Sequence, residues 1–297
     1  MTAIEANGIR IEAEARGPKE GAPLLLIRGL GTQLIHWPDR LLDGFAAAGC
    51  QVVIFDNRDA GLSERIAAAG RPDVQALAAA VAAGETPRPS YTLDDMADDA
   101  AGVLDAFGIA SAHVLGISMG GMILQTLALR RPERLRSATI VMSSSGAADL
   151  PPRDPQVDAL LWSQADDPSD REQVIDHTLR CDRVFGSPGY PFDADERRAL
   201  IARAYDRAHD PDGVMRQGAA VLGSPPRAER LARIDAPTLI IHGTDDALLP
   251  IEHGRDLARR IPGAELREVE GMGHDLEGGI CDIVLEATLR LIRRAEG

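Results

Sequence analysis

The sequence is almost without lysine. Of its 32 lysine and arginine residues, only Lys19 is a lysine, and it lies in a polar segment near the N-terminus. A P-loop nucleotide hydrolase, a pyridoxal-phosphate enzyme and a Schiff-base aldolase each need a lysine amine in the active site. The composition therefore argues against all three classes of enzyme.

Cysteines and long apolar runs are also scarce. The three cysteines, Cys50, Cys181 and Cys281, are far apart and have no C-x-x-C spacing. We interpret them as buried small hydrophobes in a reducing compartment rather than a disulfide or zinc framework. No apolar run approaches the ~18 residues of a membrane span, and residues 1–16 lack the apolar region of a signal peptide. We expect a cytoplasmic protein.

Acidic charge, in contrast, is in excess. The 297 residues carry a formal net charge of −14 and are 44% hydrophobic, enough for a sizeable core. The negative charge repels phosphate backbones and anionic lipid headgroups, so we expect neither nucleic acid nor a membrane as a partner. Such acidity is most often a property of a solvated surface, and we expect a monomer or a homodimer.

Short apolar, β-branched runs alternate with helical patterns along most of the chain. This alternation predicts an α/β fold with a mostly parallel central sheet flanked by helices. Near-continuous apolar runs are typical of strands that are covered on both faces. The predicted strands are 8–15, 23–27, 51–55, 113–117, 137–142, 238–242 and 264–269. A capping box at 92–95 predicts the start of one helix, and apolar spacing predicts two more at 119–130 and 280–293.

The alternation stops between about residues 146 and 233. This stretch is rich in Asp, Arg and Pro, and its patterns predict helices at 157–165, 171–183, 195–208 and 213–222 but no strand. We therefore predict a core made of residues 1–145 and 234–297, with a helical cap inserted at 146–233.

A G-x-S-x-G motif lies at residues 116–120, where a predicted strand ends and a predicted helix begins. A serine in such a tight turn has a strained backbone, and only glycine fits two positions before and after it. The helix directs the positive end of its dipole toward the serine, where an oxyanion would form. The bare motif also occurs by chance in glycine-rich turns, but this placement predicts that Ser118 is a nucleophile.

Two candidate partners for a catalytic base follow Ser118 in the chain. Asp245 and Asp246 come directly after the strand 238–242, at the strand end where open α/β sheets place functional groups. One of them would orient the base and the other would cap the turn, and the residues alone leave both assignments open.

The candidate base is His274, in the glycine-containing loop 271–274 that follows the strand 264–269. The glycines of this loop allow an imidazole to reach over the sheet edge to the serine, and the order Ser, Asp, His is the one that this kind of active site needs. An ordinary surface-loop histidine is the alternative. A zinc site made of Asp245, Asp246 and two further histidines, His242 and His253, is also conceivable, but the ligand spacing of a zinc site is missing and we expect no metal.

An oxyanion hole needs two backbone N–H donors. One is expected at Met119, the residue after the nucleophile, and the other at Leu30, in the loop 29–31 that follows the strand 23–27. A plain strand-to-helix turn is the alternative explanation of the glycines in that loop. We further expect Arg58 and Asp59 to form a structural ion pair with each other beneath the active site; direct contact with the substrate is the alternative.

With these motifs in place, nearly the whole chain resembles the α/β-hydrolase superfamily. Within it, the sequence is similar to the aclacinomycin methylesterase-like and carboxylesterase group. The matching stretches are 30–39, 56–63, 116–120, 189–193, 243–250 and 271–274. The resemblance implies a catalytic triad of Ser118, Asp246 and His274, and it favours Asp246 over Asp245.

The same resemblance implies that Leu30 and Met119 donate to the oxyanion. Two positions depart from the pattern of the family. Arg28 stands where many relatives have the histidine of a His-Gly pair, and Asp59 stands where many have glycine. Neither position belongs to the triad, but both bear on the substrate, since this fold hosts esterases, lactonases, C–C hydrolases and peptidases.

The sequence thus predicts a serine hydrolase that cleaves a carboxylic ester of a small molecule through an acyl-enzyme, with no cofactor. An aminopeptidase of the proline iminopeptidase type is an alternative, which would need acidic side chains in the cap to bind a free amine. A non-enzymatic small-molecule receptor on the same fold is another, although an intact triad argues against it. Haloalkane dehalogenases and epoxide hydrolases use Asp where this chain has Ser118.

Overall fold

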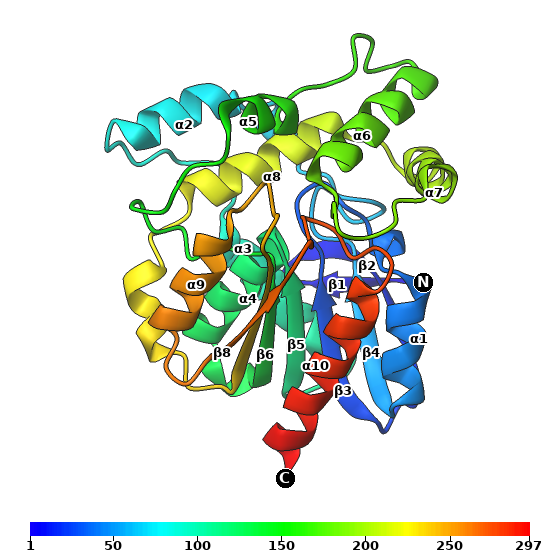
Figure 1. The fold of residues 1–297 in the computed structure, drawn as a ribbon, viewed down its shortest axis with the longest axis vertical. Helices are drawn as coiled ribbons and strands as arrows, with labels where there is room; N and C mark the ends of the chain where they lie inside the picture. The colour runs from blue at the N-terminus through cyan, green and yellow to red at the C-terminus, as the bar shows by residue number, and fades with distance from the viewer.

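Eight strands form a single sheet at the centre of the protein, which a computed structural model describes over residues 1–297 (Figure 1). The strand order is β1-β2-β4-β3-β5-β6-β7-β8, and only β1 and β2 run antiparallel to their neighbours. The predicted α/β architecture with a mostly parallel sheet is confirmed. The strands are β1 (Thr2–Ala6), β2 (Ile9–Arg16), β3 (Ala22–Ile27), β4 (Cys50–Phe55), β5 (Ala112–Ile117), β6 (Leu135–Val141), β7 (Thr238–Gly243) and β8 (Glu265–Val269).

The sequence predicts β2 to β8 to within two residues of their ends but misses β1. The buried parallel strands are recognisable because side chains of both orientations are apolar, as in β4, where all six residues are buried. β1 lies at the sheet edge, and of its five residues only Ala6 is buried. A strand that is half solvated and carries charged residues has no apolar run to mark it.

Helices cover both faces of the sheet, because neighbouring residues of a strand point to opposite sides. Leu25 and Ile27 of β3 join the core under α3 (Leu93–Ala106), α4 (Met119–Arg130) and α9 (Ile251–Arg260). Leu24 and Leu26 join the core under α1 (Asp39–Ala47) and α10 (Ile280–Glu296). The sequence predicts α3, α4 and α10 but not α1 and α9.

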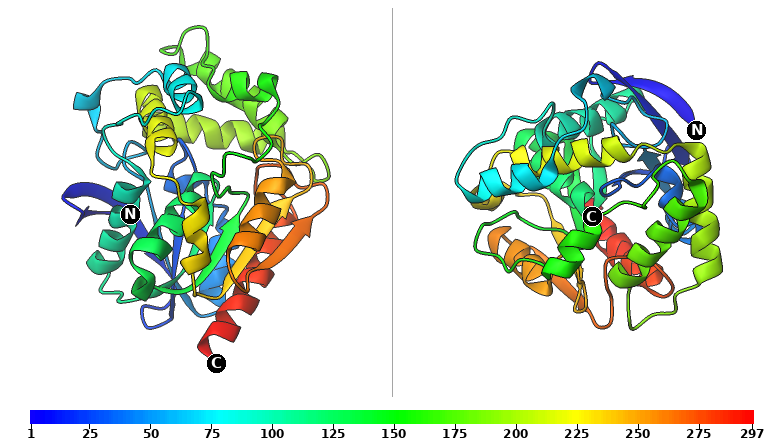
Figure 2. Two further views of the ribbon diagram at one scale, coloured as in Figure 1. Left: turned by 90° about the vertical axis from the view of Figure 1, so that its left-hand side faces the viewer. Right: turned by 90° about the horizontal axis from the view of Figure 1, so that it is seen from above.

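A further group of helices, here called the upper layer, lies over the carboxyl ends of the parallel strands (Figures 1 and 2). It holds the four helices predicted within 146–233, namely α5 (Pro155–Leu161), α6 (Arg171–Phe185), α7 (Ala194–Arg207) and α8 (Pro211–Gly223). Each of them begins at an aspartate whose carboxylate accepts a backbone N–H of the first turn, which accounts for the many aspartates of this segment.

Helix α2 (Val74–Ala82) belongs to the same upper layer and packs beside α8 (Figure 1). It comes before residue 146 in the chain and so lies outside the predicted cap, 146–233. The division into a core and an inserted cap therefore stays a prediction, and the layer itself is built from two separate parts of the chain.

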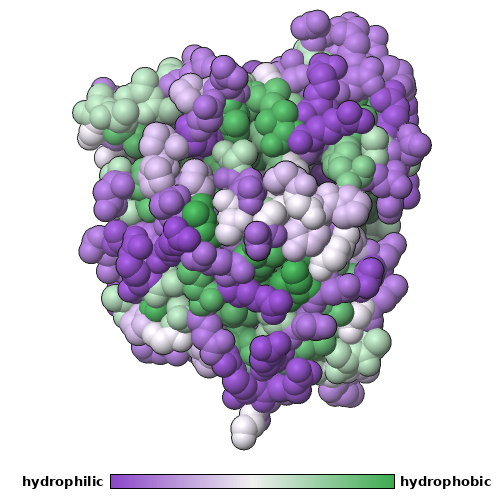
Figure 3. All heavy atoms as spheres, viewed as in Figure 1, coloured by the Kyte–Doolittle hydropathy of each residue, from purple (hydrophilic) through white to green (hydrophobic).

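The surface seen in Figure 3 is mainly hydrophilic, as the acidic composition leads one to expect. No helix has the length and apolar character needed to cross a membrane. Cys50 and Cys281 are buried free thiols as predicted, whereas Cys181 is only half-buried and contacts His177. The expectation that all three cysteines are core residues is therefore wrong for Cys181, which lies on the inner side of α6.

Candidate active site

The predicted nucleophile lies in a sharp turn between β5 and α4. Ser118 has backbone angles φ 54° and ψ −122°, in the left-handed region that side chains other than glycine rarely adopt. A Cβ at Gly116 would lie 2.3 Å from the Gly120 carbonyl oxygen, and one at Gly120 would lie 2.1 Å from the Ile27 carbonyl oxygen. Both glycines are therefore required because another backbone segment comes too close for a side chain. At Gly116 that segment is Gly120, and at Gly120 it is the end of β3.

The turn is held rigidly from the neighbouring strand. The Ser118 N–H donates to the Val141 carbonyl at 3.0 Å, and the Ser143 hydroxyl donates to the Ser118 carbonyl at 2.8 Å. These bonds to the end of β6 oppose relaxation of the strained angles. The Ser118 side chain is consequently presented above the sheet, at the floor of the upper layer.

Three predicted side chains form one hydrogen-bonded chain across this floor. His274 Nε2 lies 2.9 Å from Ser118 Oγ, and His274 Nδ1 lies 2.7 Å from Asp246 Oδ2. The loop that carries His274 is tied to the end of α6, since the His274 N–H donates to the Phe185 carbonyl at 2.7 Å. The arrangement is that of a nucleophile, a base and a carboxylate that orients the base.

The two aspartates that the sequence left open differ in their surroundings. Asp246 is 4% exposed and accepts the N–H groups of Leu248 and Leu249 at 2.9 and 2.8 Å, in addition to His274. Asp245 is exposed, points away from His274 and accepts the Gly271 N–H at 3.1 Å. The structure thus brings Asp246, not Asp245, to the imidazole.

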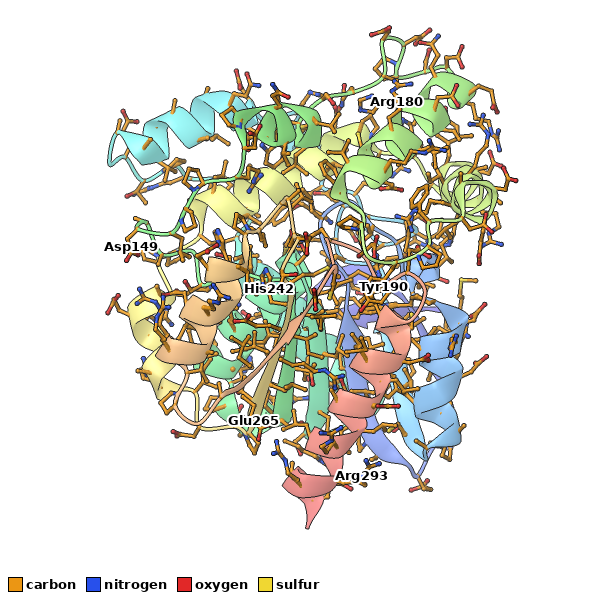
Figure 4. The ribbon with its side chains drawn as sticks, in the orientation of Figure 1. Asp149, Arg180, Tyr190, His242, Glu265 and Arg293 are labelled. Atoms are coloured by element: carbon orange, nitrogen blue, oxygen red, sulfur yellow. The ribbon has the colours of Figure 1, made fainter.

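Burial by itself would raise the pKa of Asp246. The charge and hydrogen bond of His274, with the charge of His242 and the Leu249 N–H, outweigh burial, and the pKa lies below its ordinary value. The carboxylate therefore stays ionised at neutral pH. His242, labelled in Figure 4 near the end of β7, lies 3.6 Å from this carboxylate and holds the Leu249 carbonyl at 2.7 Å.

The loop after β3 passes directly over the nucleophile, since a Cβ at Gly29 would lie 3.1 Å from the Ser118 Cβ. The Gly31 N–H is occupied, donating to Gln217 Oε1 at 2.8 Å, whereas the Leu30 N–H has no acceptor within the chain. Met119 is the first residue of α4, where N–H groups lack helical partners. These two N–H groups are the free donors beside Ser118.

Side chains from the upper layer fix this loop. Gln217 of α8 is fully buried and donates to the Arg58 carbonyl at 2.7 Å while it accepts the Gly31 N–H. Gln33 donates to the carbonyls of Ala204 and Ala208, at the end of α7, at 2.7 and 2.8 Å. The geometry around Ser118 therefore depends on α7 and α8 as well as on the sheet.

A cavity of about 500 Å³ opens between the sheet and the upper layer. Ser118, His274, Leu30 and Met119 lie on its floor, and 25 of its 50 lining residues are hydrophobic. A cavity of this size, with apolar walls over half of its lining and a few converging polar groups, is typical of a site for a small organic molecule.

The expected ion pair between Arg58 and Asp59 is wrong. Arg58 binds Asp99 of α3 at 2.6 Å, and Asp59 binds Arg216 of α8 at 2.7 Å, with all four side chains buried. Asp59 has φ 61°, which turns its side chain upward while that of Arg58 points toward α3. The two adjacent residues thus link different layers instead of each other.

The residues considered for a zinc site do not converge on one point, although His242 and Asp246 lie 3.6 Å apart. His253 contacts the Ser144 hydroxyl at 2.8 Å and the Pro151 carbonyl at 3.1 Å, while Asp246 faces His274. No group of three or more His, Cys, Asp or Glu side chains in the chain is arranged to hold a metal ion.

Several residues of the cavity wall carry no signal in the sequence. His36, Arg197 and Glu277 all line the cavity. Burial, with the charges of Arg28 and Arg197, lowers the pKa of His36 to about 3, so its ring is neutral in the folded protein. The sequence assigns no role to any of them: His36 lies in the segment after β3, while Arg197 and Glu277 reach the cavity because α7 and the loop before α10 fold back over the sheet.

Comparison with known proteins agrees with this geometry. A family model described as the alpha/beta hydrolase fold matches residues 22–178. Rhodomycin D methylesterase DauP of a Streptomyces species is 34% identical, over 92% of this chain and 91% of that protein. Rhodomycin D methylesterase DnrP of Streptomyces peucetius is 32% identical with the same coverage, 92% and 91%.

Solved structures share the fold at lower identity. A hydrolase from Pseudomonas aeruginosa superposes with a TM-score of 0.72 over 98% of this chain and 97% of that one, at 24% identity. At that identity the likeness supports the architecture alone.

Proposed function

Because the chain belongs to the α/β-hydrolase family, we propose that it is an esterase that cleaves a carboxylic ester of a small molecule, with Ser118 as nucleophile. The single observation that carries the proposal is the continuous hydrogen-bonded chain from Ser118 Oγ through His274 to Asp246, at 2.9 and 2.7 Å. Two relatives that are named methylesterases support an ester as the substrate.

Each group has a defined part in the reaction. His274 Nε2 removes the hydroxyl proton as Ser118 Oγ attacks the ester carbonyl, and Asp246 keeps the Nδ1–H tautomer and stabilises the imidazolium. The N–H groups of Leu30 and Met119 donate to the tetrahedral oxyanion. His274 then protonates the leaving alcohol, and a water molecule activated by the same ring hydrolyses the acyl-enzyme.

The floor of the cavity supplies this chemistry and its walls select the substrate. Half of the lining residues are hydrophobic, which suits an apolar substrate body. We take residues 146–233, with α2, as a cap over the nucleophile that determines which esters reach it.

The aminopeptidase alternative would need a carboxylate free to bind a substrate ammonium. The acidic side chains that line the cavity already have partners in arginines, backbone N–H groups or a serine hydroxyl. They are Asp59, Asp182, Asp210, Asp275 and Glu277. This pairing favours an ester over an amine-terminated peptide.

A fluorophosphonate probe tests the nucleophile. We expect it to label Ser118, identified by mass spectrometry of the peptide, and expect Ser118→Ala to lose ~10⁴-fold or more in the hydrolysis of p-nitrophenyl esters. Activity of Ser118→Ala within tenfold of the parent would disprove the assignment. Lactones and amino-acid anilides assayed in parallel distinguish an esterase from a lactonase or a peptidase, and loss of activity in EDTA that zinc restores would indicate a metal enzyme.

A further inference from the structure

One cationic side chain in the cavity is not used by the proposed mechanism. Arg28 precedes the loop that covers Ser118, is 8% exposed and lines the cavity. Its backbone is fixed, because Asn57 Nδ2 donates to the Arg28 carbonyl at 3.0 Å. Arg28 is also the residue directly before Gly29, where an added Cβ would lie 3.1 Å from the Ser118 Cβ.

The Arg28 guanidinium has almost no partners in the protein. Its Nε donates to Thr32 Oγ1 at 3.2 Å, and the group lies 4.8 Å from the centre of the Trp37 ring. It forms no ion pair, and its two terminal nitrogens donate no hydrogen bond to the chain. Buried arginines are normally paired, because an uncompensated charge away from water is costly.

The charged groups around Arg28 do not compensate it. Arg197 pairs with Asp182 at 2.6 Å and with Glu277 at 3.2 Å, so these two carboxylates are already engaged. Burial, with the positive charge of Arg197, lowers the pKa of Arg28 to about 9. The group remains charged at neutral pH, and it lines the cavity that would hold a substrate.

We propose that Arg28 binds a carboxylate of the substrate, and that this enzyme prefers esters that carry a second, ionised carboxyl group. The inference rests on the proposed esterase function and names the substrate class of the same site. A guanidinium fork matches the two oxygens of a carboxylate. Stacking on Trp37 holds the side chain in place, so that little conformational freedom is lost when the anion binds.

The charge in the cavity favours a monoanion over a phosphate. One guanidinium is uncompensated, while Asp182 and Glu277 lie close enough to raise the pKa of Arg28 and would repel a dianion. A carboxylate therefore matches the charge of this site, and a phosphate monoester does not.

The test compares charged and neutral esters of equal size. The p-nitrophenyl half-esters of dicarboxylic acids of increasing length place the carboxylate on the acyl side, and alkanoyl p-nitrophenyl esters of the same length are their neutral partners. Aryl acetates with and without a ring carboxylate place it on the leaving group. We expect kcat/KM to be higher for the charged member of at least one pair.

Arg28→Gln should lower kcat/KM for the preferred charged ester by about 10- to 100-fold, the range of a hydrogen bond to a charged group, and change the neutral partner by less than about threefold. Arg28→Lys keeps the charge but loses the fork, so we expect it to retain part of the preference. If Arg28→Gln does not fold, Arg28→Lys still reports, because a loss confined to the charged ester is expected. Arg180→Gln is the control, since Arg180 is exposed on α6 and does not line the cavity (Figure 4).

Binding measured without turnover separates this proposal from the proposed function. Isothermal titration of Ser118→Ala with the half-esters should show weaker binding by about 10- to 100-fold when Arg28→Gln is added. That loss would support the carboxylate site even if the wild-type protein hydrolysed none of the esters, an outcome that would refute only the esterase function. Hydrolysis through Ser118 without a preference for charged esters, or equal losses on charged and neutral esters in Arg28→Gln, would overturn the role of Arg28 and leave the esterase function standing.

Discussion

Replacing Asp246 by asparagine should nearly stop turnover while leaving the fold in place. The Asp246 carboxylate accepts the N–H groups of Leu248 and Leu249 on one oxygen and His274 Nδ1 on the other. An asparagine can keep the first two bonds only by turning its carbonyl oxygen toward them. Its amide group then faces Nδ1 of His274 and donates to it.

The consequence is a change of tautomer. With Nδ1 as an acceptor, the ring proton of His274 moves to Nε2, which faces Ser118 Oγ at 2.9 Å and can no longer take its proton. The same change in a serine protease triad lowers kcat by ~10⁴. That loss corresponds to about 5.5 kcal/mol of transition-state stabilisation at ~1.4 kcal/mol per tenfold.

Asp245→Asn is the matched control one residue away. Asp245 is exposed, and it accepts from the Thr244 hydroxyl at 2.6 Å and from the Gly271 N–H at 3.1 Å. An asparagine keeps an acceptor oxygen there, so we expect a rate within about threefold of wild type and a stability change below about 1 kcal/mol. Initial rates on a p-nitrophenyl ester and thermal melting of both variants provide the comparison. A slow Asp245→Asn enzyme, or an Asp246→Asn enzyme within tenfold of wild type, would refute the reasoning.

Three further predictions concern stability. Gly120→Ala places a Cβ 2.1 Å from a β3 carbonyl and should cost about 3 kcal/mol or more in urea unfolding, whereas Gly279→Ala, whose nearest contact would be 3.6 Å, should be tolerated. Burial holds the pKa of His242 below its ordinary value, so the contribution of this residue is present above about pH 6.5 and falls as the pH drops, by up to ~1.4 kcal/mol per pH unit. Burial also lowers the pKa of other histidines, among them His113 and His253, so His242→Gln should make the melting temperature fall less steeply between about pH 7 and 5, and an unchanged slope would contradict this. Arg216→Met leaves Asp59 buried without its cation and should lower the free energy of unfolding by about 3–5 kcal/mol in the same urea assay. A decrease of less than about 1 kcal/mol would contradict this role of the ion pair.

Much of the fold could be predicted because its signals are local. Buried parallel strands such as β4 need apolar side chains on both faces, and the capping box before α3 is contained within four residues. The turn at Ser118 is recognisable from a motif of five residues, although its second glycine is required by the approach of β3. The sequence does not predict α1, α2 and α9, each of which is only nine or ten residues long and takes its stability from packing against the rest of the protein.

The choice between Asp245 and Asp246 shows where local signals end. Both residues follow the same strand and have the same chemistry, so the sequence favours one only through a family resemblance. Burial and direction separate them in the structure, since Asp246 is 4% exposed and faces His274, while Asp245 turns outward to Gly271. Arg58 and Asp59 show the same limit, because their partners lie 41 and 157 residues away.

The amino-acid sequence by itself determined strands β2 to β8, the nucleophile turn and the order of the candidate triad, because the signals of those features lie in neighbouring residues and in backbone geometry. Only the tertiary structure decided which aspartate meets His274, that α2 joins the upper layer, and that Arg28 is buried in the cavity without a carboxylate partner. These outcomes depend on side chains that meet across long sequence separations, where packing and the pairing of buried charges select one arrangement among many that the local pattern allows.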